Sequence, residues 1–389
     1  MRVKIKEICE INPKQEVLAD ESIVSFIGMA QISNDNQFDT SILKKYKDVK
    51  KGFSSFKNGD ILFAKITPCM ENGKGVLIEN LYNEIGFGST EFHVLRVNLE
   101  IVSKKYLYWF TKWKTFRLNC EKNMTGSAGQ KRVPKNYIEN YELNLPKLFV
   151  QEKRVKILDC LLEIKQKKLQ KLVELENLSK CLFVEMFGDP ILNEKKWRMD
   201  ICKNISTKIG SGSTPKGGEK SYQTKGITFI RSMNVYNNNF YYKDLAFISE
   251  EQGRKLSNVE VEREDILLNI TGASVARCCI VPENILPARV NQHVSIIRCK
   301  KDIVNTIFLC YQFTTKEYQD FLWKLATSNG ATREALTKQQ EENLKVIIPP
   351  IELQNQFAER IKLIEKSKFI VKKNLKLVLS IQNYLFYTN

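Results

Sequence analysis

Polar side chains suited to hydrogen bonding follow several strand-like segments of this sequence. Arginine, lysine and asparagine can make paired hydrogen bonds to purine edges, while serine, threonine and lysine hold phosphate groups. Each residue alone is more simply a solvated loop residue. Their clustering in equivalent loops of a basic chain nevertheless favours readout of a nucleic acid. The candidates are Lys65, Thr67, Asn72 and Lys74 in the first half, and Arg231, Ser232, Asn234, Asn269, Thr271 and Arg277 in the second.

The loop GSGSTPKGG, at residues 210–218, combines glycines with hydroxyl groups and a lysine. Ser213, Thr214 and Lys216 are suited to a phosphate group, but the loop lacks the spacing of a nucleotide-binding motif. Contact with a DNA backbone and a plain turn are therefore its two interpretations.

Motifs for catalysis are missing. The sequence has no GxxxxGK[ST] loop, no GxSxG motif, no glycine-rich cofactor loop after a strand, and no paired carboxylates followed by Glu-x-Lys. The 10 cysteines include no CxxC pair, and only His93 and His293 are available as histidine ligands. We therefore expect no metal site, reduced and mostly buried thiols in a cytoplasmic protein, and two histidines packed in strands. The pattern indicates a protein that reads a partner rather than an enzyme.

The segments that position these loops occur twice, about 200 positions apart, a period too long for a solenoid. LPKLFVQ (145–151) matches IPPIELQ (348–354), GDILFAKIT (59–67) matches EDILLNIT (264–271), and SFIGM (25–29) matches TFIRSM (228–233). The repeat predicts two domain-sized halves built on one plan.

Each half is predicted to be a mixed α/β unit. Alternating apolar runs predict strands at 60–66, 76–78 and 92–97, and again at 227–230, 265–270 and 293–298. Helical spacing predicts one helix from 103 to about 120 and one from about 304 to 325. The aromatic residues of the first helix, Tyr106, Phe110, Trp113 and Phe116, are interpreted as core rather than as a base-stacking surface.

A long stretch without proline or glycine follows each half, at 151–187 and 352–389. Apolar residues alternate there at spacings of three and four, which predicts two long helices that pair with each other. The first should end at FGDP (187–190), because Gly188 can cap a helix and Pro190 cannot continue one. The predicted inter-helix residues are Leu158, Leu161, Leu172, Leu175, Leu182, Ile361, Ile364, Val371, Leu375, Val378 and Leu385.

Composition adds a strong charge bias, since 61 Lys+Arg against 44 Asp+Glu give a formal net charge of +17. Such an excess favours a polyanionic partner, above all nucleic acid, although a merely lysine-rich surface is the simpler alternative. A membrane is disfavoured because no apolar run approaches the roughly 20 residues of a spanning helix, and the N-terminus does not resemble a signal peptide.

The junction LP-x(4)-Q, the linker LF-x-EMFGDP and the opening KKWRMDICKNISTKIGSGSTP of the second half closely resemble the specificity subunits of Type I restriction–modification systems. The resemblance covers essentially the whole chain. It implies an α+β fold with two target-recognition domains in pseudo-two-fold repeat, separated by two long helices that form an antiparallel coiled coil. The implied segments are 1–146 and 190–349 for the domains, and 147–189 and 350–389 for the helical spacers.

The resemblance also implies a function. Each domain would read one half of a bipartite double-stranded DNA site. The helices would space the domains and dock two methyltransferase subunits, to which restriction endonuclease subunits add. The chain itself would catalyse nothing, and S-adenosylmethionine, ATP and Mg would be held by the partner subunits.

This sequence departs from the commoner family pattern at its first junction, where LPKLFVQ lacks a second proline, and at the loop GSAGQKR (126–132), which differs from SNGATRE (328–334). These loops add Lys131, Arg132 and Arg333 to the candidate DNA contacts. Two alternatives stay open: a DNA-processing enzyme with an unrecognised active site, and a coiled-coil adaptor that does not bind DNA.

Overall fold

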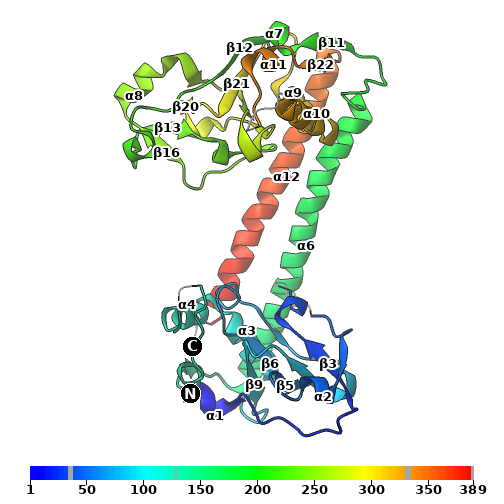
Figure 1. The fold of residues 1–389 in the computed structure, drawn as a ribbon, viewed down its shortest axis with the longest axis vertical. Coiled ribbons are helices and arrows are strands. Elements are labelled where there is room, and N and C mark those ends of the chain that lie inside the picture. The colour runs from blue at the N-terminus through cyan, green and yellow to red at the C-terminus, as the bar shows by residue number, and fades with distance from the viewer. Residues whose placement is uncertain (34–37, 128, 329–333, 387–389) are drawn as a thin grey trace. The chain divides into compact units, whose positions relative to one another are not determined.

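The computed structural model describes residues 1–33, 38–127, 129–328 and 334–386. The chain forms two compact units: unit 1 comprises Met1–Leu169 with Lys372–Asn389, and unit 2 comprises Gln170–Val371. Both long helices are therefore divided between the units, and each unit is described by itself below (Figure 1).

The described residues of unit 1 form two four-stranded sheets and a two-stranded one. The first has the order β2-β9-β6-β7, the second β4-β3-β8-β5 with β3 parallel to β8, and the third pairs β1 with β10. The strands are β1 (Arg2–Lys4), β2 (Cys9–Ile11), β3 (Ile23–Ile27), β4 (Leu43–Lys45), β5 (Ser54–Lys57), β6 (Ile61–Ala64), β7 (Gly75–Leu77), β8 (Ile85–Gly88), β9 (Phe92–Val97) and β10 (Glu142–Asn144). The helices are α1 (Ile5–Ile8), α2 (Tyr46–Val49), α3 (Lys104–Lys112), α4 (Lys114–Lys122) and α5 (Lys135–Glu139).

Unit 2 repeats this topology. Its sheets have the orders β12-β21-β18-β19, β16-β13-β20-β17 with β13 parallel to β20, and β11-β22, beside a β14-β15 hairpin. The strands are β11 (Arg198–Ile201), β12 (Ser206–Ser211), β13 (Ile227–Ile230), β14 (Val235–Tyr236), β15 (Asn239–Phe240), β16 (Ala246–Ile248), β17 (Glu260–Val261), β18 (Ile266–Asn269), β19 (Cys278–Ile280), β20 (Ala288–Val290), β21 (Val294–Cys299) and β22 (Lys345–Ile348). The helices are α7 (Cys202–Ile205), α8 (Glu250–Lys255), α9 (Thr306–Phe313), α10 (Lys316–Thr327) and α11 (Lys338–Glu342). The predicted duplication of one mixed plan is confirmed.

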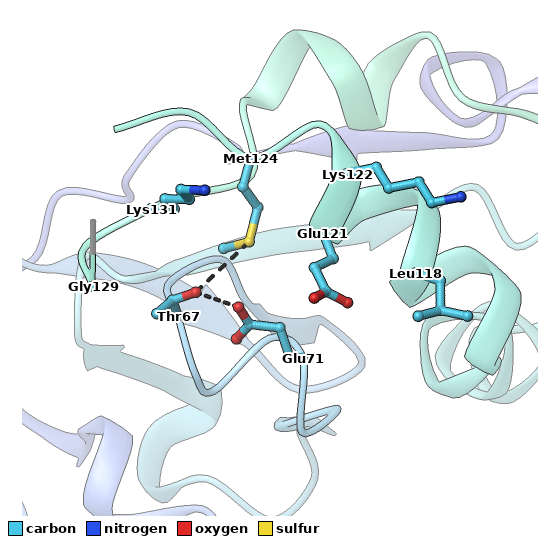
Figure 2. Close-up of a pocket in the computed structure, with 8 residues that line it drawn as sticks. All are labelled: Thr67, Glu71, Leu118, Glu121, Lys122, Met124, Gly129 and Lys131. Atoms are coloured by element: carbon cyan, nitrogen blue, oxygen red, sulfur yellow. Dashed lines mark hydrogen bonds between the residues drawn. The ribbon is translucent and has the colours of Figure 1, made fainter. Parts of the chain in front are cut away.

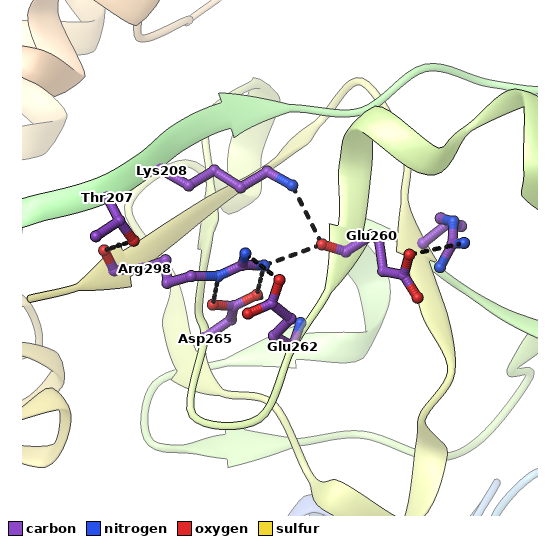
Figure 3. Close-up of polar contacts among 7 residues, drawn as sticks. Thr207, Lys208, Glu260, Glu262, Asp265 and Arg298 are labelled. Atoms are coloured by element: carbon purple, nitrogen blue, oxygen red, sulfur yellow. Dashed lines mark hydrogen bonds and ion pairs between the residues drawn. The ribbon is translucent and has the colours of Figure 1, made fainter.

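A buried ion pair marks the same place in both units. In unit 2 the Arg298 guanidinium donates to both oxygens of Asp265, at 2.8 and 2.9 Å, and Asp265 is fully buried (Figure 3). In unit 1 Arg96 donates to Asp60 at 2.9 and 2.7 Å. Each pair joins two neighbouring strands, β21 with β18 and β9 with β6. Because a forked guanidinium matches a carboxylate, the pair fixes strand register from within.

The two predicted single helices are each broken, which corrects that prediction. In unit 1 the chain turns at Trp113, whose ψ of 128° is extended, so α3 and α4 are separate helices. In unit 2 the break falls at Thr314 and Thr315, and the Thr315 hydroxyl caps α10 by accepting from the Tyr318 N–H. The aromatic side chains of α3 are buried as expected: Tyr106 and Phe110 belong to the unit 1 core.

One glutamine anchors the start of each long helix. In α6 (Leu148–Phe187) the buried Gln151 accepts from the Ser103 N–H at 2.9 Å and donates to the carbonyls of Ile101 and Pro146. In α12 (Ile351–Tyr384) the buried Gln354 likewise accepts from Asn305 N–H at 2.8 Å. It donates to the carbonyls of Ile303 and Pro349, at 3.4 and 2.7 Å. These contacts explain why proline and glutamine recur five residues apart in both junctions.

Within each unit, a half of α6 packs against a half of α12 (Figure 1). In unit 2, Phe183 and Phe187 contact the ring of Phe357, near the start of α12, and Lys368 is ion-paired with Glu176. Late residues of α6 therefore meet early residues of α12, which is antiparallel pairing. The predicted register agrees with burial: Leu158, Leu161, Leu182, Ile361, Ile364, Val371 and Val378 are buried, and Leu172, Leu175, Leu375 and Leu385 are half-buried.

The cysteines and histidines take structural places. All 10 cysteines are free, most are buried, and Cys160 and Cys181 are exposed. His93 lies in β9, whereas His293 lies one residue before β21 rather than within it. Across the described residues, no group of three His, Cys, Asp or Glu side chains could hold a metal ion, and no helix is long and apolar enough to cross a membrane.

Candidate nucleic-acid interface

In unit 1 the predicted loop residues meet at the end of β6. Ile66 pairs with Arg132 in an isolated bridge, the Thr67 N–H donates to the Lys131 carbonyl at 3.0 Å, and the Lys65 carbonyl accepts from Val133 N–H at 2.9 Å. The segment that follows β6 and the segment that ends the loop 126–132 are therefore held side by side. This brings Lys65 and Thr67, which follow β6, next to Lys131; the sequence named all three as candidate DNA contacts but did not predict that they meet.

A cavity of about 610 Å³ opens between this edge and α4 (Figure 2). It is lined by Thr67, Lys131 and Lys122, but also by the carboxylates of Glu71 and Glu121. The Thr67 hydroxyl donates to Glu71. The mixture of cations, hydroxyl and carboxylates suits hydrogen bonding to base edges better than tight phosphate binding.

Arg132, a candidate DNA contact, has an internal partner. Its guanidinium makes a forked ion pair with Glu91, with Nε and Nη2 donating at 2.9 and 2.8 Å. The Arg132 hydrogen bonds lower the pKa of the Glu91 carboxyl. The arginine thus holds its loop against the strand edge and presents the neighbouring Lys131, which is exposed.

His93 contacts the backbone of the same edge at Val133. Its Nε2 lies 2.8 Å from the Val133 carbonyl, and its side chain is 3% exposed. Burial lowers the pKa of His93 to about 4, so the ring is neutral near pH 7. A neutral ring can donate to the carbonyl and orient the loop.

The remaining unit 1 candidates lie farther along the loop after β6. The Asn72 N–H donates to the Pro68 carbonyl at 3.1 Å, and the Lys74 N–H donates to Cys69 at 2.9 Å, so this loop is coiled on itself. Asn72 is exposed and Lys74 is half-buried.

Unit 2 builds an equivalent edge at the end of β18. Thr271 pairs with Ala335, the Gly272 N–H donates to the Glu334 carbonyl at 2.9 Å, and the Leu336 N–H donates to Ile270 at 2.8 Å. Glu334 therefore takes the place that Lys131 takes in unit 1. The two edges share a backbone frame but carry opposite charges at this position.

Gln292 and His293, which were not among the candidate DNA contacts, connect the unit 2 candidates. Thr214 donates to the Gln292 side chain, Gln292 Nε2 lies 3.1 Å from His293 Nε2, and His293 Nδ1 lies 2.6 Å from the Thr271 hydroxyl. This series of hydrogen bonds joins the loop after β12, the turn before β21 and the end of β18 into one polar edge. Gln292 directly precedes the predicted strand 293–298 and His293 was placed within it, and that position was the only sequence signal for either residue.

Three unit 2 candidates make contacts within the chain, and the burial of Asn234 and Asn269 corrects their assignment as DNA contacts. Asn234 and Asn269 are fully buried. Asn234 accepts from the Arg231 N–H and donates to the Tyr241 carbonyl, while Asn269 donates to the Ser232 carbonyl at 2.9 Å. Arg231 donates to the Asp244 carbonyl at 2.6 Å and is ion-paired with Glu219. These side chains shape the loops because amides and guanidinium groups satisfy backbone carbonyls as readily as base edges.

The other unit 2 candidates remain available at the surface. Ser213, Thr214 and Lys216 are exposed, and Ser232 is half-buried. The Arg277 guanidinium stacks 4.5 Å from the ring centre of Tyr236, which lies outside the polar edge just described. Arg333 lies outside the described residues.

Comparison with known proteins now decides the family. The family model of the type I restriction modification DNA specificity domain matches residues 1–177 of this chain and again residues 195–380. The chain belongs to this family. The two matches fall on the two copies of the repeat.

Two relatives of this chain are named as specificity subunits, in agreement with the family match. The chain is 49% identical over 152 residues to the EcoAI specificity subunit of Escherichia coli, and 44% identical over 146 residues to the EcoEI specificity subunit of the same organism. These matches cover 38% and 37% of this chain, and 26% and 24% of the relatives, so the chain spans about a quarter of their length. A solved S subunit of a Type-I restriction-modification system from M. genitalium shares the fold, with a TM-score of 0.58 at 14% identity, over 99% of this chain and 94% of that one.

Proposed function

We propose that this specificity-family chain is the non-catalytic subunit that reads a bipartite double-stranded DNA target for a type I restriction–modification complex. One half-site would be read by the unit 1 edge and the other by the unit 2 edge. The observation that carries the proposal is the duplicated edge itself, at residues 65–67 beside 131–133 and at residues 270–272 beside 334–336.

The charge of the chain supports this reading. A net charge of +17 supplies phosphate affinity that is independent of sequence, whereas the polar edges supply discrimination between bases. Lys131 on one edge and Glu334 on the other are chemically suited to different base edges, because lysine donates to guanine and glutamate accepts from cytosine.

The remaining parts of the proposal concern partners. Two methyltransferase subunits would dock on the helical segments, and restriction subunits would add to them in the cytoplasm. S-adenosylmethionine, ATP and Mg would bind to those partners. The support is the names of the relatives, which are subunits of type I restriction enzymes.

The test restores the chain to its methyltransferase partner and maps adenine methylation across a host genome. We expect a bipartite motif. Lys131→Ala should relax or change one half of that motif only, because the residue lies on the unit 1 edge. Lys51→Ala, an exposed change in the loop after α2 with the same loss of charge, is the matched control.

Two results would contradict the proposal. One is a motif whose two halves change together with Lys131→Ala. The other is methylation or cleavage of DNA by the purified chain alone, which would favour an enzyme over a recognition subunit.

A further inference from the structure

A second cavity in unit 1, of about 380 Å³, is lined by four cations and no acidic side chain among the described residues. Its cations are Lys112 from α3, Lys114 and Arg117 from α4, and Lys165 from α6. We call it the basic pocket. Apolar side chains of the two long helices, including Leu162 and Leu379, form part of its wall.

The basic pocket is built rather than incidental. The Lys112 ammonium donates to the carbonyls of Gly73 and Gly75, at 2.8 and 2.7 Å, and the Arg117 guanidinium donates to the Glu71 carbonyl at 2.6 Å. A Cβ atom on Gly73 would lie 3.0 Å from the Arg117 guanidinium, so glycine lets the loop lie against it. Burial, with the nearby charges of Arg117 and Lys165, lowers the pKa of Lys112 to about 7, as expected of a cation that lacks an anion.

Unit 2 provides an internal comparison for Lys165. The matching lysine on α12 is Lys368, which is ion-paired with Glu365 at 2.8 Å and with Glu176 at 3.7 Å. In the repeat, Glu365 corresponds to Leu162 and Glu176 corresponds to Leu379. Unit 2 therefore supplies its own carboxylates at this place, whereas unit 1 has leucine at both positions, and among the described residues no carboxylate is ion-paired with Lys165.

The same comparison applies to α4. Arg117 is the fourth residue of α4, and the fourth residue of α10 is Gln319, which donates to the Ala276 carbonyl at 2.7 Å. A neutral amide thus suffices for the loop contact, and Thr314 stands where unit 1 has Lys112. At these two positions unit 2 carries neutral side chains, so the positive charge is a feature of unit 1 and not of the plan that the two units share.

We propose that the basic pocket binds a backbone phosphate of double-stranded DNA beside the half-site read by unit 1. This inference rests on the proposed DNA-recognition function. DNA is favoured as the occupant because the basic pocket adjoins the unit 1 edge, at residues 65–67 beside 131–133. Asn72 and Gly73 of its rim belong to the loop that begins at Thr67, and α4 lines both cavities, with Lys114 and Arg117 on one and Lys122 on the other. Contacts to phosphate fix the register of a protein on the duplex, and the three lysines and the arginine of the pocket suit that role.

The decisive variant gives unit 1 the carboxylate that unit 2 already has. Leu379→Glu places an acid beside Lys165, as Glu176 lies beside Lys368, and Leu379 is 47% exposed, so the helix should tolerate it. Leu377→Glu is the matched control, since Leu377 is 59% exposed on the same helix, does not line the pocket and makes the same change in net charge. Folding of both is checked by circular dichroism and thermal unfolding.

Binding of the full chain to a fluorescent DNA duplex is measured across a salt series. Leu379→Glu should weaken binding at least about threefold relative to Leu377→Glu and reduce the slope of log K against log salt by about 0.9, the value for one phosphate contact. Arg117→Gln, which copies Gln319, should act in the same direction. Equal binding by Leu379→Glu and Leu377→Glu would overturn the inference while leaving DNA recognition intact.

A second titration separates DNA from an acidic protein as the occupant. Polyglutamate competes with the duplex for wild-type chain and for Leu379→Glu. Loss of polyglutamate binding without loss of DNA affinity would assign the pocket to a protein segment and overturn the proposal. A wild-type chain with no salt-dependent DNA binding would overturn both the proposal and the proposed function.

Discussion

The glutamine at the start of each long helix should be worth several kcal/mol to the unit that holds it. Gln354→Met keeps the approximate length and volume of the side chain but removes its hydrogen bonds. The Asn305 N–H and the Pro349 carbonyl then lose partners at 2.8 and 2.7 Å in a site where Gln354 is 0% exposed. The third bond, to Ile303 at 3.4 Å, is long and adds little.

The magnitude follows from the two short bonds. A buried backbone group left without a partner costs about 1–3 kcal/mol, so the pair predicts a loss of about 2–6 kcal/mol. Gln354→Glu should be at least as damaging, because a carboxylate oxygen would then face two carbonyl oxygens. Urea unfolding followed by circular dichroism measures the loss, and hydrogen exchange at Asn305 should rise because its N–H is released.

The control is Gln356→Met, an exposed position two residues along the same helix. The equivalent pair in unit 1 is Gln151→Met against Gln166→Met, where Gln166 is exposed on α6. If Gln354→Met and Gln356→Met unfold at the same urea concentration, the anchoring role is wrong and the recurrence of glutamine needs another explanation.

Three further perturbations test the electrostatics of the two units. Burial raises the pKa of Glu341 to about 7. The folded state therefore loses stability as pH rises from about 4.5 through 7. At about 1.36 kcal/mol per pKa unit, this loss amounts to about 3 kcal/mol. Glu341→Gln should remove this loss, and thermal unfolding should show a gain at pH 8 and almost none at pH 4; an equal gain at both would refute it. Burial lowers the pKa of His93 to about 4, so stability should fall as pH drops from about 6.5 through 4, and His93→Gln should flatten that part of the pH profile. Asp265→Asn removes the buried partner of Arg298, which keeps its ion pair with Glu262, and should cost about 1–3 kcal/mol in urea unfolding. Glu264→Gln, at a half-exposed neighbour, should cost under about 1 kcal/mol.

Periodic features of the sequence predicted the architecture well. The repeat of LPKLFVQ and IPPIELQ located both long helices, and the three-four spacing gave the residues that are buried along them. The spacing of apolar residues is a local signal, and the junction motif occurs in both halves of the sequence. Neither required knowledge of long-range contacts. The breaks near Trp113 and Thr314 were missed because a single extended residue interrupts an otherwise continuous helical pattern.

The candidate site was predicted only at the level of loops. Asn269 and Asn234 looked like DNA contacts because amides pair with bases, yet they pair with carbonyls of the chain. Arg132 meets Glu91 across 41 positions, a contact that no short-range pattern encodes. Gln292 was overlooked because its role depends on Thr214, which a distant loop brings to it.

The two units can be used to separate folding from function without any other sequence. Positions that both units keep, such as Asp60 with Asp265 and Gln151 with Gln354, make the same contacts twice, so the shared scaffold accounts for them. Positions that differ while the backbone contact persists need another cause. Arg117 and Gln319 make one loop contact with different charge, and Lys131 and Glu334 hold one strand edge with opposite charge. Because the scaffold accepts either member of each pair, on the proposed function the choice between them reflects what each unit binds, and these positions would distinguish the two half-sites.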